Sequence, residues 1–384
     1  MPGAVLTLQC SEFSVSPEGP MNPNRIFLFT LFLIVLASAL CLQSQDQKAS
    51  TLMPIGKPVQ IEVPLGLPAV PIPSDNPPTA ETIALGRRLY YDPILSADNS
   101  VSCASCHDPQ FGFADPRQFS EGVGKKLGGR NSPPVVNSAY FRVQFWDGRS
   151  PSLENQAEGP VQNPVEMANT LATVEQRLNA GPSYREEFAR AWGPKPITYE
   201  MVEKSIATFE RTVISGNSPF DRWKYGHDEK AVDAAVKRGF VVFTSKEKGN
   251  CAVCHVVGDK NALFTDNKFH NVGVGVDMGQ FTDVGLFAVT HNDADKGKFK
   301  TPSLRNIAQT APYLSDGSLK DLKQVVDFYI GAGNSNPNLD KEIHVLDFLT
   351  GQERSDLQAF LNSLTGEMPA NAGPPEVNKT QARK

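Results

Sequence analysis

Apolar side chains recur at helical spacing in two widely separated stretches of the chain. They are Ile206, Phe209 and Val213 in the first stretch, and Leu357, Phe360, Leu361 and Leu364 in the second. Positions i, i+3, i+4 and i+7 share one face of an α-helix, so each stretch predicts a helix that packs one face against a core.

A second pattern precedes each of these stretches. Gly86 is followed four residues later by Tyr90, and Gly239 is followed four residues later by Phe243, each in a segment that predicts a helix. The chain therefore carries a weak internal repeat, in which an early helix and a late helix enclose the residues between them. Two unrelated helical packings remain the alternative, because the matching pattern is short.

The remaining segments are rich in proline, glycine or polar residues. Residues 43–78 are rich in Pro, Ser and Gln and predict an exposed, mostly extended lead-in, while residues 367–384 predict a flexible tail. Long Gly-rich loops run from Gly112 to Gly129 and from Gly258 to Gly285. Loops of this length in a compact domain are often functional.

The N-terminal segment has the pattern of an export signal. Residues 21–25 are polar and basic, residues 26–42 form an uncharged and largely apolar run, and Ala37-Ser38-Ala39 is an A-x-A cleavage signature. We predict a signal peptide region over residues 1–42, with translation starting at Met21, and a periplasmic protein. A membrane anchor is the alternative, although this apolar run is at the short end for a span.

Length and charge narrow the class of protein. The 384 residues include 37 Lys and Arg and 42 Asp and Glu, which gives a net charge of −5 at pH 7. The length without the signal region suggests two domains of ordinary size, which we place at residues 79–220 and 221–366. A mildly acidic chain offers no basic field for nucleic acid.

The cysteines indicate which chemistry the two domains carry. Two motifs have the spacing C-x-x-C-H, formed by Cys103, Cys106 and His107 and by Cys251, Cys254 and His255. This motif is typical of c-type haem attachment, in which the thiols bind the haem covalently and the histidine is the proximal ligand of the iron. Zinc or a thioredoxin-like dithiol is the alternative, but zinc takes four ligands from one compact site. Two haems imply electron transfer or redox catalysis.

We therefore expect a mainly α fold with two cytochrome c-like haem domains and long loops. In each domain the haem would lie between the early and the late helix. The Gly-rich loop that follows each motif would wall the far side of the haem.

The chain resembles the bacterial di-haem cytochrome c peroxidase family, which includes the MauG proteins of methylamine utilisation. The resemblance covers residues 78–366. Besides the haem motifs it rests on residues 85–92 (LGRRLYYD), 130–133 (RNSP), 144–149 (QFWDGR), 156–167 (QAEGPVQNPVEM) and 301–313 (TPSLRNIAQTAPY). This combination in this order is highly specific to the family.

The resemblance implies a role for each site residue. The haem on His107 is expected to be the peroxidatic one, and the haem on His255 an electron relay. Glu166 would act as acid and base in cleavage of the O–O bond, and Gln156 would position hydrogen peroxide. Trp146 would carry electrons between the haems. The segment that contains Gln156 and Glu166 shows no simple helical period.

The resemblance also implies a structural calcium ion. Asn131, Thr310 and Pro312 match the positions that hold Ca²⁺ between the two haems. Oxygen ligands, including backbone carbonyls, suit calcium. A rigid turn without a metal ion is the alternative.

One departure from the family pattern concerns the loop before residues 130–133. Many relatives close the peroxidatic iron with a histidine on this loop, but residues 123–129 (VGKKLGG) contain none. We therefore expect an open iron that is ready for peroxide without prior reduction. A neutral lysine could bind the iron, but a pKa of about 10.4 keeps a lysine protonated.

A second departure concerns the relay haem. The family usually places a methionine opposite the proximal histidine, whereas the register of residues 301–313 places Tyr329 there, as in the MauG proteins. Leu322, Val325, Val326 and Tyr329 also form one helical face, so a core aromatic is the alternative. Met278 is the substitute ligand if the register differs.

The resulting prediction is a peroxidase that reduces hydrogen peroxide to water with electrons from a small donor, a monohaem cytochrome c or a cupredoxin. One alternative is MauG-like, peroxide-dependent oxidation of a partner protein, although residues 245–250 lack the aromatic that MauG offers before its second haem site. The other is a di-haem electron-transfer protein, which would gain nothing from Glu166 and Gln156. The resemblance also implies a homodimer.

Overall fold

The computed structural model describes residues 52–376, so the predicted signal peptide region lies outside the described residues. The described chain is mainly helical, as predicted, with long loops and short strands. The α-helices are α2 (Ala80–Tyr91), α3 (Leu153–Gln162), α4 (Leu171–Ala180), α5 (Pro182–Trp192), α6 (Tyr199–Glu210), α7 (Pro219–Lys224), α8 (Ala234–Thr244), α9 (Phe287–Thr290), α10 (Leu322–Ile330) and α11 (Gly351–Asn362).

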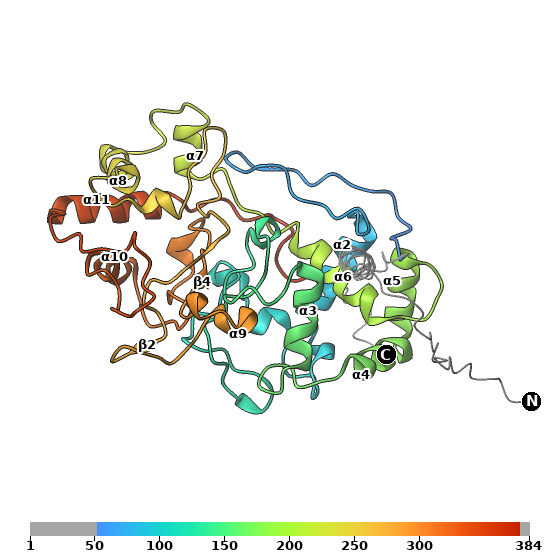
Figure 1. Cartoon of the computed structure of the whole chain (residues 1–384). Coiled ribbons are helices and arrows are strands. Elements are labelled where there is room, and N and C mark those ends of the chain that lie inside the picture. The colour runs from blue at the N-terminus through green and yellow to red at the C-terminus, as the bar shows by residue number, and fades with distance from the viewer. Residues whose placement is uncertain (1–51, 377–384) are drawn as a thin grey trace, which may run out of the picture. The chain divides into compact units, whose positions relative to one another are not determined.

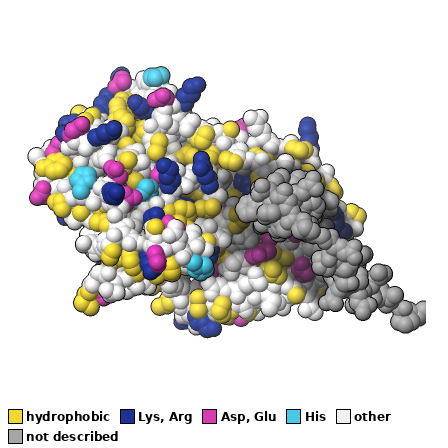
Figure 2. Space-filling view, in the orientation of Figure 1, with side chains coloured by type: hydrophobic (Ala, Val, Ile, Leu, Met, Phe, Trp, Pro, Cys, Tyr) yellow, Lys and Arg dark blue, Asp and Glu magenta, His cyan; other side chains and the backbone are white. Residues whose placement is uncertain are grey.

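The strands form two small antiparallel pairs. β1 (Phe269–His270) pairs with β4 (Phe299–Lys300), and β2 (Val276–Asp277) pairs with β3 (Gln280–Phe281). Among residues 52–376, no helix is long and apolar enough to span a membrane. Basic and acidic side chains are interspersed on the face shown in Figure 2.

Two large hydrophobic cores hold the helices. In the first, α2 packs against α6, with α3 and α5 beside them; in the second, α8 packs against α11, with α10 below (Figure 1). Leu89, Trp192 and Ile206 are buried in the first core, and Phe243 and Phe360 in the second. The domain boundary near residue 220 stays a prediction.

Both helix pairs cross at a glycine. A Cβ atom at Gly86 would overlap the carbonyl oxygen of Ser205, and one at Gly239 would overlap the carbonyl oxygen of Asp356. Only glycine permits this approach of two backbones. The weak repeat in the sequence therefore corresponds to two helix pairs with the same crossing point. The late helix of the first pair is shorter than predicted, since α6 ends at Glu210 and Val213 lies buried in the turn that follows.

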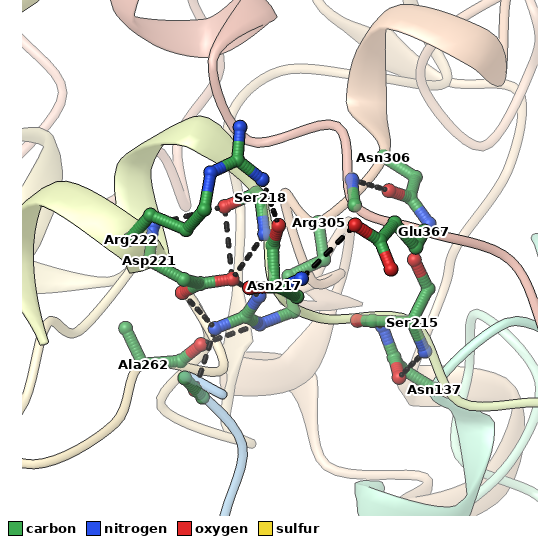
Figure 3. Close-up of polar contacts among 12 residues, drawn as sticks. Asn137, Ser215, Asn217, Ser218, Asp221, Arg222, Ala262, Arg305, Asn306 and Glu367 are labelled. Atoms are coloured by element: carbon green, nitrogen blue, oxygen red, sulfur yellow. Dashed lines mark hydrogen bonds and ion pairs between the residues drawn. The ribbon is translucent and has the colours of Figure 1, made fainter. Parts of the chain in front are cut away.

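The repeat extends into the loops. Asn137 and Asn306 both have a left-handed backbone, with φ of 62° and 57°, and each precedes a 3-10 turn, Ser138–Tyr140 and Ile307–Gln309. Each asparagine side chain also bonds the backbone that follows a late helix (Figure 3). Asn137 exchanges hydrogen bonds with Ser215, and the Oδ1 atom of Asn306 accepts from the N–H of Gly366.

The lead-in is less exposed than predicted. Its described part contains no helix, and Leu67 and Asn76 in it are buried. It contacts both cores: the N–H of Ile55 donates to the carbonyl of Ala191 in the first, and the N–H of Ala262 in the second donates to the carbonyl of Gly66. The predicted flexible tail also begins as a packed segment. The Tyr91 hydroxyl donates to the carbonyl of Ala372 at 2.6 Å, and residues 377–384 lie outside the described residues.

A buried ion pair joins the lead-in to the second core (Figure 3). The guanidinium group of Arg305 donates to both carboxylate oxygens of Asp221, at 2.8 and 2.9 Å, and to the carbonyls of Gly66 and Ala262. The side chains of Arg305 and Asp221 are only 1% and 0% exposed. The polar atoms of this cluster are buried, so water does not reach them. The protein itself therefore supplies their hydrogen-bond partners.

We predict that Arg305→Met destabilises the protein by about 3–5 kcal/mol, because it leaves the carboxylate of Asp221 buried and unpaired. Lys323→Met is the matched control, since it breaks the exposed pair with Asp327 and should leave the free energy of unfolding essentially unchanged. Chemical denaturation of both variants measures this. A loss no larger for Arg305→Met than for the control would show that the buried pair is not essential.

Candidate active site

Each C-x-x-C-H motif folds into one tight turn. Cys103–Ser105 and Cys251–Val253 are 3-10 turns, and each continues to its histidine. The N–H of His107 donates to the carbonyl of Cys103 at 3.0 Å, and the N–H of His255 donates to that of Cys251 at 2.9 Å. Two thiols and an imidazole therefore gather within one turn at each site.

The protonation of these groups suits haem attachment. Burial lowers the pKa of His107 and of His255, which keeps both imidazoles neutral, as ligation of a metal requires. The Nδ1 atom of His255 lies 2.8 Å from the carbonyl oxygen of Phe264. A carbonyl only accepts, so Nδ1 carries the proton and Nε2 stays free for a metal.

The zinc alternative has no site in the described part of the chain. Across residues 52–376, no group of three or more His, Cys, Asp or Glu side chains is placed to hold a metal ion. Burial raises the pKa of Cys106 to about 11 and that of Cys251 to about 12.

A cavity of about 540 Å³ opens beside the first motif. Its size is in the range of cofactor sites. The predicted site residues that line it are Cys103, Cys106, His107, Asn131, Trp146, Gln156 and Glu166. The residues predicted for the first haem are thus brought together around one space that a large cofactor fits.

Gln156 and Glu166 reach this cavity from a helix and the turn after it. The segment was expected to lack a helical period, but α3 covers residues 153–162, because Ser152 caps its first turn by accepting from the N–H of Asn155. Pro160 lies inside the last turn of α3, where it cannot donate to the helix. The helix stops soon after, and the chain turns so that Glu166 also faces the cavity.

The carboxyl group of Glu166 is suited to proton transfer. Burial raises its pKa, while a hydrogen bond from Asn163 at 2.6 Å and the nearby charge of Arg149 act in the opposite direction. The net pKa lies above the ordinary value of 4.5. A carboxyl group with a raised pKa gives and takes a proton more readily near neutral pH.

The loop before residue 130 is packed against this segment. The N–H of Val123 donates to the carbonyl of Glu166 at 2.7 Å, and a Cβ atom at Gly122 would overlap the same backbone. The ammonium group of Lys126 donates to the carbonyl of Pro164 at 3.1 Å. Backbone and side-chain hydrogen bonds thus hold the loop in place.

Trp146 contacts both halves of the chain. It lines the cavity and donates from Nε1 to the carbonyl of Asn131 at 2.8 Å. It also packs in one small core with Val274 and Phe299, which belong to the second half. The indole therefore lies where the two halves meet.

Tyr329 lies beside the second motif. It is on α10, and burial raises its pKa, together with the nearby Cys254 and Cys251. The phenol is thus close to both thiols of the second motif. Met278, by contrast, is 92% exposed between β2 and β3. The structure therefore does not support Met278 as the substitute ligand.

The three predicted calcium residues occupy adjacent segments. Asn131 and Thr310 are buried, and the N–H of Asn131 donates to the carbonyl of Ser315 at 2.8 Å. The side-chain amide of Asn131 donates to the carbonyls of Arg117 and Gln118. Pro312 follows Thr310 in the neighbouring segment. Calcium binding stays a prediction.

Two further cavity residues escaped the sequence analysis. Arg149 lies with its guanidinium carbon 3.5 Å from the ring centroid of Phe145, close to Glu166. Glu210, on α6, is 5% exposed, and burial raises its pKa to about 8. The only sequence signal was the position of Glu210 four residues after Ile206, which places both on one helix face.

Comparison with known proteins places the chain in a family. The sequence profile of the di-haem cytochrome c peroxidase family matches residues 80–229. The methylamine utilization protein MauG of Methylorubrum extorquens is 43% identical over 305 residues, which cover 79% of this chain and 83% of MauG. The cytochrome c peroxidase Ccp of Escherichia coli is 37% identical over 304 residues, which cover 78% of this chain and 61% of that protein.

A solved structure agrees. A MauG-like protein associated with microbial copper homeostasis superposes with a TM-score of 0.74 at 32% identity, covering 80% of this chain and 96% of that protein. These similarities and the haem-binding turns identify an oxidoreductase with two haem cofactors. The chain belongs to the di-haem cytochrome c peroxidase family, which also contains the MauG proteins.

Proposed function

We propose that the chain reduces hydrogen peroxide to water, using two electrons and two protons for each peroxide. The observation that carries this proposal is the buried carboxyl group of Glu166, which shares one cavity with Gln156 and His107. A site that only passed electrons would have no use for an acid–base group there.

The side chains of the first site divide the work. Cys103 and Cys106 would hold a haem covalently, and His107 would be its iron ligand; the haem supplies the iron that binds peroxide and takes up its oxidising equivalents. Glu166 takes a proton from one peroxide oxygen and gives it to the other, which leaves as water. The amide of Gln156 orients the peroxide.

The second site supplies electrons. Cys251, Cys254, His255 and Tyr329 would hold a second haem, and the donor would be a monohaem cytochrome c or a cupredoxin. Trp146 lies between the halves and shortens the path for electrons. The proposal includes haem domains at residues 79–220 and 221–366, export to the periplasm and a homodimer.

We predict that Glu166→Gln slows the reaction with peroxide about 10²–10⁴-fold, the usual contribution of a general acid or base. Stopped-flow spectroscopy of the ferric holoprotein measures this rate. Glu186→Gln is the control, because Glu186 is exposed on α5 and should react like the wild type. Equal rates in all three proteins would remove Glu166 from the mechanism.

Adding reduced monohaem cytochrome c to the same reaction separates the rival functions. Rapid return of the ferric spectrum supports a peroxidase. An oxidised state that persists in the presence of the cytochrome supports the MauG-like alternative, which Tyr329 favours. Absence of any fast reaction in the wild type would leave the electron-transfer alternative.

We predict that the fully ferric enzyme reacts with peroxide at once, without prior reduction. The loop at residues 123–129 carries no histidine. Neither of its lysines, Lys125 and Lys126, lines the cavity, and Lys126 donates to the carbonyl of Pro164. Lys126→Met should therefore leave the electron paramagnetic resonance spectrum of the first haem unchanged. A requirement for pre-reduction, or a spectral change in this variant, would reveal a sixth ligand.

The intact mass of the same sample counts the attached haems and locates the N-terminal cleavage.

We predict that Tyr329→Phe changes the optical spectrum of the second haem and raises its reduction potential. An oxygen ligand that becomes anionic on the iron favours the ferric state, and the metal offsets the effect of burial on the phenol. Phenylalanine keeps the ring and removes only the hydroxyl group, so packing is preserved. An unchanged spectrum and potential would mean that Tyr329 is only a core aromatic.

A further inference from the structure

The two repeats match residue by residue beyond the haem motifs. Lys300 lies six residues before Asn306, as Asn131 lies six residues before Asn137. The match continues after these asparagines. Phe145 and Gly148 have a left-handed backbone, as do their counterparts Leu314 and Gly317. The isolated bridge between Gln144 and Ser150 has its counterpart in the bridge between Tyr313 and Leu319. Asn131 and Lys300 therefore occupy equivalent positions, and so do Trp146 and Ser315.

These positions bond each other across the contact between the halves. The N–H of Asn131 donates to the carbonyl of Ser315, and the N–H of Lys300 donates to the carbonyl of Trp146, both at 2.8 Å. Exchanging the two repeats converts one bond into the other, because Asn131 corresponds to Lys300 and Ser315 corresponds to Trp146. The contact is thus pseudo-symmetric, like the self-complementary interface of a two-fold dimer.

The side chains at this contact differ between the repeats. On one side lie Asn131 and Thr310, two of the residues predicted to hold calcium. On the other side, the counterpart of Thr310 is Phe141, and the ammonium nitrogen of Lys300 lies 3.4 Å from the centroid of the Phe141 ring. The place that corresponds to the predicted metal site therefore holds a side-chain cation above an aromatic face.

Lys300 has no anionic partner in the described structure. Its residue is 6% exposed, and neither a hydrogen bond nor an ion pair of its ammonium group is found among residues 52–376. Burial lowers its pKa to about 7. A buried charge without a partner is unfavourable, so its presence at a contact between two redox sites calls for a function.

We propose that Lys300 is a built-in cation at the counterpart of the predicted calcium site and that its charge raises the reduction potential of the haem on His255. Lys300 belongs to the segment that runs past the second site, because the backbone of Pro302, two residues later, lies beside the ring of His255. A positive charge in a poorly solvated region favours the state with one more electron. This inference rests on the di-haem function proposed above.

The test compares reduction potentials of three holoprotein variants at pH 6, where the ammonium group is charged. Lys300→Met keeps the length of the side chain and removes the charge. Lys268→Met is the matched control, because Lys268 is exposed on the segment that precedes β1 and makes no side-chain bond in the described structure. Lys300→Arg restores the charge.

In Lys300→Met we expect the ferrous-to-ferric ratio of the second haem, at a fixed ambient potential, to fall about tenfold, which corresponds to ~59 mV for one electron. Lys268→Met should match the wild type, and Lys300→Arg should recover most of the shift. A wild-type potential in Lys300→Met, with both haems attached, would overturn the proposal. If Lys300→Met does not retain haem, Lys300→Arg decides. This variant keeps the charge, so a potential below that of the wild type would also overturn the proposal.

Two further measurements keep this result separate from the other proposals. Potentials are read without peroxide, so a chain without peroxidase activity can still show the shift. Chelation with EGTA tests calcium directly, through a change in the stability of the wild type. If Lys300→Met lowers the potential and EGTA does not change the stability, the results support the built-in cation and contradict the predicted calcium ion.

Discussion

The buried ion pair of Arg305 and Asp221 determines where three otherwise irregular segments lie. Through its four hydrogen bonds, Arg305 connects the lead-in at Gly66, the start of α7 and the loop at Ala262 that follows the second haem motif. Helices account for little of this region, so the buried carbonyls of Gly66 and Ala262 find a partner in one guanidinium group. The first site uses the same device. Arg130 donates to Asp147 and to Asp283, and thereby ties the segment of Trp146 to the long loop of the second half. Most of the candidate site residues lie outside the α-helices, and arginine–carboxylate pairs hold their segments in position.

The contact between the halves shows how one repeated frame carries two different sites. The reciprocal bonds of Asn131 and Lys300 are made by the backbone, so they survive any change of side chain. The side chains are then free to diverge. The indole at position 146 corresponds to a hydroxyl group at position 315, and the amide at position 131 corresponds to an ammonium group at position 300. A duplicated scaffold can thus give a peroxide site and a relay site without a change of fold.

Sequence patterns predicted the helices better than the loops, for physical reasons. The Gly86 and Gly239 pattern located both helix crossings, because close backbone approach leaves a glycine at a fixed place. The predicted end of α6 was wrong, and α3 was not predicted. The turn at residue 211 and the cap at Ser152 depend on local hydrogen bonds that periodicity does not record. The resemblance selected Gln156, Glu166 and Trp146, and the structure brings all three to one cavity, although Trp146 comes from a separate segment. Glu210 and Lys300 were not predicted, because a buried charge is recognised only when its surroundings are known.

The same frame explains how Tyr329 comes to face the second site. α3 and α10 both begin three residues after the second partner of an isolated bridge, Ser150 or Leu319, and both start with a side-chain cap. Counted from those starts, Pro160 in α3 corresponds to Tyr329 in α10, and Pro160 lines the cavity of the first site. Where the first helix ends, the chain turns and brings Glu166 to the cavity. The second helix ends at nearly the same place, at Ile330, and the phenol of Tyr329 lies in its last turn. In the proposed function, Glu166 would move protons at the first site, whereas Tyr329 would close the iron of the second site. This is the difference that a peroxidase with a relay requires.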